Sequence, residues 1–191
     1  MLRYLVIVGA VVNIAGVWGY IRDTISGKTK PNRVTWLMWS VIPAIAVVAA
    51  ISKGVTWAVV PVAFAGLAPL LVFVVSFANR NAYWKLGAFD YFCGALSVAA
   101  LVLWALTKDP IVAIGFSIAS DWCASWPTYA KSWTSPETES GIAYTTGAFN
   151  ALTGLLAVRS WTFPEYGFPL YLLINSSVIA ILVYRKRIRK R

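Results

Sequence analysis

Histidine is absent from this 191-residue chain, and charged residues make up only 13% of it. The missing imidazole excludes histidine general acid–base catalysis, Ser–His and Cys–His nucleophile pairs and most transition-metal sites. The two cysteines, Cys93 and Cys123, fit no zinc or redox spacing, and we expect buried thiols. Soluble domains are typically about 45–50% apolar and about 25% charged, whereas this chain is 59% apolar with a mean hydropathy of +0.69. The composition therefore predicts a membrane protein.

Long apolar runs occupy most of the sequence. A helix needs about 20 mainly apolar residues to cross the hydrocarbon of a bilayer. Seven stretches are close to this length, at 4–21, 34–52, 55–78, 86–107, 110–131, 140–158 and 166–184. The segments between them are short and rich in Gly, Pro, Ser, Asn and charges, as loops are. We predict an all-α polytopic membrane protein with seven transmembrane helices, the first being a true span rather than a cleaved signal peptide.

The 17 basic residues are distributed unequally between the two ends of these spans. Four of them lie on the side of the N-terminus, and 13 lie in the loops after the first, third and fifth spans and in the tail 185–191. Basic loops stay in the cytoplasm, so we predict a plasma or inner membrane protein with its N-terminus outside and its C-terminus cytoplasmic. The net charge of +10 then indicates topology and not a nucleic-acid partner, and the basic tail is expected to contact anionic lipid.

Residues 1–80 and 110–191 resemble each other at a spacing of 108–109 residues. The matched pairs are Asn13/Asp121, Trp18/Trp126, Pro61/Pro169, Tyr20/Tyr129, Arg22/Lys131 and Thr29/Thr138. We therefore divide the chain into a first three-helix repeat at 1–80, a linker helix at 81–109 and a second three-helix repeat at 110–191 that carries the basic tail. Three helices and one linker return the chain to its starting side, so the repeats are parallel, with a central cavity expected between them.

Polar side chains near the middle of a span are costly in hydrocarbon and mark candidate functional sites. Asn13, Asp121, Asn150 and Asn175 lie at this depth, and we predict that they bind substrate. Asp121 is the only acidic residue there, and because burial disfavours a charged carboxyl, it is the candidate for proton coupling. The alternative that these side chains only join helices stays open. Asp90 lies near the predicted cytoplasmic side, where a structural ion pair with a basic neighbour is expected.

Tryptophans and prolines inside the spans are the remaining candidates. Trp39 and Trp126 are predicted to stack on a ring-shaped ligand, with core or lipid packing as the alternative. Pro43 and Pro127 each remove a backbone hydrogen bond within a span, and we predict that they act as helix hinges.

The second half contains Trp126-Pro127-Thr128-Tyr129-Ala130-Lys131 and then Ser135-Pro136-Glu137-Thr138-Glu139-Ser140. This pattern resembles the SWEET/PQ-loop family, as do the three-plus-one-plus-three layout and the outside N-terminus. The resemblance implies a pocket with asparagines on the third helix of each triplet and aromatics on the second. Asn175 matches one such asparagine, whereas its counterpart falls near Leu67, and no Pro-Gln pair is present. The layout also resembles vitamin permeases of the nicotinamide-riboside type and microbial rhodopsins, but the last span lacks the lysine that retinal requires.

Three classes of function are compatible with these features to different degrees. The leading hypothesis is a small transporter or facilitator that moves a small polar solute by alternating access, with proton coupling if Asp121 titrates. The alternative is a non-transporting receptor, sensor or assembly subunit. An enzyme is not expected, because no nucleophile motif, P-loop or dinucleotide fingerprint is present. We expect no cofactor and no metal, and whether the chain forms a homo-oligomer stays open.

Overall fold

The computed structural model describes residues 2–80, 84–107 and 109–188. The long helices are α1 (Leu2–Ile25), α2 (Arg33–Ser52), α3 (Val59–Val75), α4 (Ala88–Thr107), α5 (Pro110–Thr134), α6 (Gly141–Leu156) and α7 (Phe163–Ile188). A short 3-10 helix, η1 (Pro136–Thr138), precedes α6, and no strand occurs in the described ranges. The prediction of an all-helical chain with seven long helices is confirmed.

The helix ends follow from local side-chain chemistry. The Asn32 side chain caps α2 by accepting hydrogen bonds from the backbone of Val34 and Thr35. Asp109 caps α5 in the same way, directly before a proline at the first helical position. Gly54, with φ of 80°, ends α2 in the left-handed region. The turn around this glycine explains why α3 begins at Val59 and not at residue 55, as the apolar pattern predicted.

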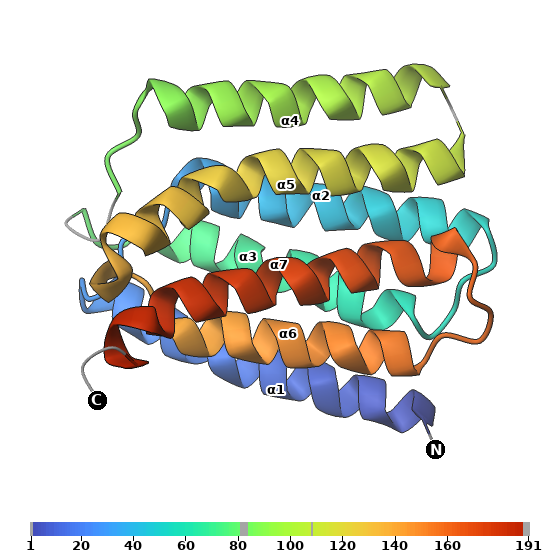
Figure 1. Ribbon diagram of the computed structural model, residues 1–191, viewed down its shortest axis with the longest axis horizontal. Helices are drawn as coiled ribbons and strands as arrows, with labels where there is room; N and C mark the ends of the chain where they lie inside the picture. Colours follow the sequence, from blue (N-terminus) through green and yellow to red (C-terminus); the bar gives the residue numbers. More distant parts are fainter. Residues whose placement is uncertain (1, 81–83, 108, 189–191) are drawn as a thin grey trace.

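The long helices lie side by side, with their lengths in the same general direction (Figure 1). In the first half α3 packs against both α1 and α2, and in the second half α7 packs against both α5 and α6. The halves meet where α1 packs against α6 and α2 packs against α5, which closes six helices into a ring. Helix α4 lies outside this ring and packs mainly on α5 (Figure 1). The two termini lie at opposite ends of the bundle.

Helix α4 is held on the ring by polar contacts. The hydroxyls of Ser97 and Ser120 each donate to the other residue's carbonyl, at 2.8 and 2.7 Å. The buried Asp90 carboxylate accepts from the Asn32 amide at 2.5 Å and from the Gly87 backbone at 2.6 Å. The prediction that Asp90 forms an ion pair with a basic neighbour is wrong. The ion pairs found among the described residues are Lys28–Asp23 and Lys131–Glu139. The amide and the backbone N–H satisfy this carboxylate instead.

Helix α5 buries polar side chains and exposes apolar ones, which is the reverse of the distribution in a helix on the surface of a soluble protein. Its faces toward the ring and toward α4 carry buried polar side chains, namely Ser117, Ser120, Asp121, Ser125, Thr128, Lys131 and Ser132. Its outward face exposes Ile111, Trp122, Trp126 and Trp133. All six other long helices also expose large apolar side chains. Soluble monomers seldom expose apolar surface on this scale.

Among the described residues, four helices are long and apolar enough to cross a membrane: Tyr4–Ile25, Arg33–Ser52, Ala88–Thr107 and Phe163–Arg185. Val59–Val75 is a shorter apolar helix.

At the end of α7, the Arg185 guanidinium lies 3.6 Å over the Trp133 ring. The prediction for the basic tail falls on side chains from 186 onward, which lie outside the described part of the chain.

Helices α1 and α6 approach closely through two glycines. A β-carbon at Gly9 would overlap the Thr153 side chain, and one at Gly16 would overlap Thr146. The two glycines are seven residues apart, as are the two threonines in the antiparallel partner, so both contacts lie on one helix face. Small residues of this kind allow helix backbones to pack tightly in membranes.

Gly16→Leu is therefore expected to destabilise the fold, since overpacking costs about 1–3 kcal/mol and this contact lies between the two halves. The matched control is Gly115→Leu on α5, where nothing lies within 4 Å of an added β-carbon. Thermal unfolding of both purified variants in one detergent provides the measurement. Equal melting temperatures for the two variants would contradict the α1–α6 packing.

Candidate functional site

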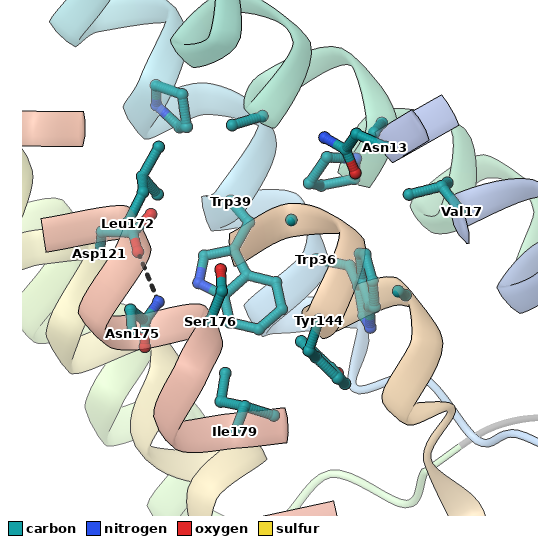
Figure 2. A pocket seen from close by; sticks show the side chains of 16 residues that line it. Asn13, Val17, Trp36, Trp39, Asp121, Tyr144, Leu172, Asn175, Ser176 and Ile179 are labelled. Carbon is teal, nitrogen blue, oxygen red and sulfur yellow. Dashed lines mark hydrogen bonds between the residues drawn. The ribbon is translucent and has the colours of Figure 1, made fainter. Parts of the chain in front are cut away.

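A cavity of about 80 Å³ lies between the six ring helices (Figure 2). Every ring helix contributes to its lining, whereas none of the described side chains of α4 does. Its main polar and aromatic lining residues are Asn13 on α1, Trp36 and Trp39 on α2, Asp121 on α5, Tyr144 on α6 and Asn175 on α7. The apolar remainder of the lining includes Pro43 on α2 and Ala65, Ala68 and Pro69 on α3.

Asp121 is the acidic residue of this cavity and is 1% exposed. Its Oδ2 accepts hydrogen bonds from the Tyr171 hydroxyl at 2.7 Å and from the Asn175 amide at 3.4 Å. Asn175 also donates to the Ser125 hydroxyl at 3.1 Å and accepts from the Tyr129 hydroxyl. The second carboxylate oxygen, Oδ1, is buried with no hydrogen-bond partner among the described residues. This oxygen is a free acceptor in an otherwise satisfied network.

Three aromatic side chains line the same cavity. The Trp36 and Trp39 rings meet at 78°, with centroids 5.3 Å apart, and the Trp39 and Tyr144 rings meet at 76°, with centroids 6.2 Å apart. The Trp39 indole N–H donates to the Ser125 hydroxyl at 3.0 Å, and the Tyr144 hydroxyl donates to Glu139 at 2.8 Å. These bonds fix the polar ends of both rings, which leaves the ring bodies as cavity wall.

The structure brings together most of the predicted binding residues. Asn13, Trp39, Asp121 and Asn175 all line the cavity, and so does the predicted hinge Pro43 (Figure 2 labels the first four). These residues come from four helices that are far apart in sequence.

Three predicted residues lie elsewhere. Asn150 is buried outside the cavity, where its amide donates to the Pro61 carbonyl at 3.0 Å and joins α6 to α3. Trp126 is 44% exposed and packs against Trp122 and Tyr129 on the outside of α5. Pro127 lies within α5 but does not line the cavity. The position of Trp126 follows from helix geometry, since five residues after Asp121 is about 140° around the helix.

The cavity residues fall into pairs separated by 108 positions. The pairs in which both members line the cavity are Asn13/Asp121, Trp36/Tyr144, Trp39/Gly147 and Ala68/Ser176. Tyr144 and Ser176 did not stand out in the sequence, because tyrosines and serines are frequent in this chain. Adding 108 to Trp36 and Ala68 would have identified both.

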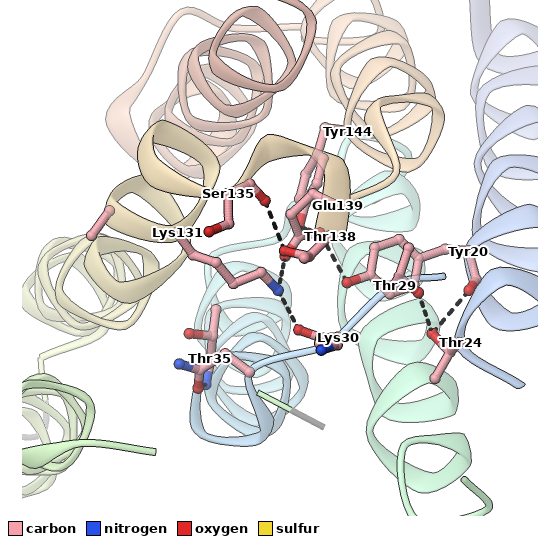
Figure 3. Close-up of polar contacts among 12 residues, drawn as sticks. Tyr20, Thr24, Thr29, Lys30, Thr35, Lys131, Ser135, Thr138, Glu139 and Tyr144 are labelled. Carbon is pink, nitrogen blue, oxygen red and sulfur yellow. Dashed lines mark hydrogen bonds and ion pairs between the residues drawn. The ribbon is translucent and has the colours of Figure 1, made fainter. Parts of the chain in front are cut away.

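A buried ion pair lies next to the cavity at the end where α5 finishes and α6 begins (Figure 3). Lys131 Nζ lies 2.5 Å from Glu139 Oε1, and both side chains are fully buried. The other carboxylate oxygen of Glu139 accepts from the hydroxyls of Tyr20 at 2.9 Å and Tyr144 at 2.8 Å. Lys131 also donates to the backbone carbonyl of Lys30. This cluster joins α1, the α1–α2 loop, α5 and α6 across the two halves.

Apolar side chains pack together toward the other end of the bundle. Ile42, Ala46, Val62, Phe168 and Leu172 belong to one buried cluster there. The cavity is thus flanked by a polar cluster toward one end of the bundle and by an apolar cluster toward the other.

Comparisons with known proteins identified no relative of this chain. No protein-family model, curated protein or solved structure matches the chain.

Proposed function

We propose that this protein is a membrane transporter in which a small polar solute binds in the central cavity. The seven helices would all span the membrane, and the two halves would move against each other to expose the cavity alternately to the two sides. The observation that carries this proposal is a cavity lined by all six ring helices, with a buried carboxylate oxygen that has no partner among the described residues.

The membrane setting is supported by the inverted distribution of side chains. Exposed apolar side chains occur on every long helix, and buried hydroxyl, amide and carboxyl groups lie inside. Helix α5 is 25 residues long, which is sufficient to cross the hydrocarbon although it carries several polar residues. Since those residues face the interior, its outer face would still be apolar against lipid. Helices α3 and α6 have 17 and 16 residues, close to the shortest spans.

Two parallel repeats are supported by the packing pattern. Exchanging α1, α2 and α3 with α5, α6 and α7 maps each contact of the ring onto another observed contact. The cavity pairs at a spacing of 108 residues follow the same exchange. We therefore infer an approximate two-fold axis through the cavity along the membrane normal, as in parallel-repeat transporters.

The SWEET/PQ-loop resemblance gains support from the cavity and also meets a difference. Aromatic side chains line it from the second helix of each triplet, Trp36 and Trp39 on α2 and Tyr144 on α6, and Asn175 lines it from the third helix of the second triplet. In the first triplet Leu67 is half exposed, and the amide comes from Asn13 on α1 instead. We infer a similar architecture with a different arrangement of polar groups.

The orientation follows from the basic loops. The loops after α1, α3 and α5 and the C-terminal tail carry 13 of the 17 basic residues, so this end would be cytoplasmic. The Lys131–Glu139 cluster lies at the same end. The cluster would keep the cytoplasmic side of the cavity closed, and it would have to separate when the cavity opens inward.

A non-transporting receptor or assembly subunit is less well supported. Such a protein does not require a polar cavity between its halves, whereas alternating access does.

Gly147 and Ser176 meet inside this cavity, where a β-carbon at Gly147 would lie 3.4 Å from the Ser176 hydroxyl. A large side chain at Ser176 would therefore fill the space that a solute needs.

Solute flux into proteoliposomes is the test of this proposal. The wild-type protein is expected to transport at least one member of a panel of labelled sugars, amino acids, nucleosides and small amines, measured with and without a pH gradient. Ser176→Trp is expected to abolish that flux while still purifying as a folded protein. If no solute moves faster than in Ser176→Trp vesicles, the proposal is wrong.

A further inference from the structure

The cavity contains an acidic side chain with no basic side chain to balance it. Among the residues that the structure describes, none of those lining it is lysine or arginine. The ion pairs of the described residues join Lys28 to Asp23 and Lys131 to Glu139, and neither involves Asp121. The titratable groups that hydrogen-bond in the Asp121 network are the hydroxyls of Tyr171 and Tyr129, which donate without carrying positive charge. A buried carboxylate of this kind requires either a proton or a cation.

One oxygen of the Asp121 carboxylate is not used in hydrogen bonding and is available to a cation. Tyr171 and Asn175 both approach Oδ2 of Asp121, while Oδ1 has no partner among the described residues. The residue is nearly fully buried, so bulk water is not an adequate substitute. Because Asp121 lines the cavity, we infer that this oxygen accepts from a group bound there.

The aromatic lining suits a cation that carries alkyl groups. Trp36, Trp39 and Tyr144 stand at steep angles to one another around the same space. Aromatic faces attract substituted ammonium groups through their quadrupoles, most strongly where water is excluded. A bare metal ion would instead need several oxygen ligands, and no group of three or more metal-binding side chains is found in the described part of the chain.

Two prolines in the cavity lining also leave backbone carbonyls of the lining residues without a helix donor. Pro43 and Pro69 have no N–H, so the carbonyls of Trp39 and Ala65, four residues earlier, lack their usual helix donor. All four residues line the cavity. The volume of about 80 Å³ is well below the roughly 300–1,000 Å³ of pockets for drug-sized ligands, which favours a small ligand.

We propose that the cavity binds a small organic cation, with its substituted ammonium between Asp121 and the rings of Trp36, Trp39 and Tyr144. This proposal deepens the proposed function, because it names the substrate class of the same cavity. Binding would form an ion pair with the free Asp121 oxygen and cation–π contacts with the rings. When the cation leaves, Asp121 would take up a proton, so the site would exchange one positive charge for another.

Equilibrium binding to purified protein tests this assignment without any requirement for transport. The probes are choline and 3,3-dimethyl-1-butanol, which have the same shape and differ in the positive charge. Titration is followed by isothermal calorimetry in a maltoside detergent, which carries no ammonium group. We expect choline to bind saturably and at least about tenfold more tightly than the neutral alcohol, which corresponds to roughly 1.4 kcal/mol.

Substitutions of single residues show which side chains contribute to choline binding. Asp121→Asn is expected to remove the preference for choline over the alcohol, and Trp39→Leu is expected to weaken choline binding about tenfold. Trp126→Leu is the matched control, because this tryptophan lies on the outside of α5. If Asp121→Asn does not fold, the comparison of Trp39→Leu with Trp126→Leu decides the question.

Three results would overturn the proposal. These are equal binding of the alcohol and choline, no saturable choline binding, and unchanged choline preference in Asp121→Asn.

Dihexanoyl phosphatidylcholine serves as a further probe, since a lipid head group carries the same trimethylammonium. If it binds more tightly than choline, the site serves a lipid and not a free solute. Flux of a neutral solute in proteoliposomes would leave the transporter proposal intact while this one fails.

Discussion

Replacing Lys131 with methionine is expected to lower the free energy of unfolding by about 3–5 kcal/mol. The substitution leaves the Glu139 carboxylate buried, with the hydroxyls of Tyr20 and Tyr144 as its remaining donors in the cluster. An uncompensated buried charge is costly because neither water nor a counterion can reach it. Methionine retains much of the length of the lysine side chain, so the loss measures the charge more than the packing.

Lys28→Met is the matched control for this prediction. Lys28 pairs with Asp23 at 3.7 Å, and its side chain is 76% exposed. Exposed pairs contribute about 0–1 kcal/mol. Thermal unfolding of both variants in one detergent should therefore separate them clearly. The double variant Lys131→Met/Glu139→Gln removes both charges and keeps an acceptor for the tyrosines, so it should recover part of the loss. Equal stability of Lys131→Met and Lys28→Met would contradict the buried ion pair.

Asp121→Asn is expected to have the largest effect on transport. The asparagine keeps the shape of the side chain but can neither carry a negative charge nor exchange a proton. Hydrogen bonds to a charged group contribute about 1.5–3 kcal/mol, so solute binding at this position should weaken roughly 10- to 100-fold. Any residual flux in proteoliposomes should no longer respond to an imposed pH gradient.

Asn150→Ala provides the control for a buried polar residue that lies outside the cavity. Its amide donates to the Pro61 carbonyl, so its loss should reduce stability while the pH response of the remaining flux persists. Full activity of Asp121→Asn at every pH, with an unchanged response to the gradient, would exclude proton coupling through this residue.

The sequence was sufficient to predict residues whose chemistry stands out against their surroundings. Asn13, Asp121 and Asn175 are polar groups in apolar runs, and the cost of placing them in hydrocarbon indicated an interior site. All three line the cavity, whereas Asn150, which was chosen by the same reasoning, is buried outside it. Helix α4, the predicted linker, packs outside the ring, and its role as a linker between two repeats stays a prediction.

The direction in which a side chain points was harder to predict from residue type alone. Trp126 was chosen as an aromatic residue inside a span, yet it faces outward. The polar positions 117, 121, 125, 128 and 132 recur every three to four residues and define the inner face of α5, from which Trp126 could have been excluded. The Lys131–Glu139 pair could not be predicted in this way, because Glu139 lies in the short connection between η1 and α6, where helix periodicity does not apply.

Accessibility of a single cysteine at position 176 tests the central claim most directly. The assay uses a Ser176→Cys variant in which Cys93 and Cys123 are replaced by alanine, reconstituted with known orientation in sealed vesicles. A membrane-impermeant maleimide is applied from each side separately, so no knowledge of the substrate is needed. The cavity is expected to be labelled from both faces, and the double variant Lys131→Met/Glu139→Gln, which lacks the ion pair and is expected to be more stable than Lys131→Met, should increase labelling from the cytoplasmic face. Labelling from one face only, or from neither, in both backgrounds would contradict alternating access through this cavity.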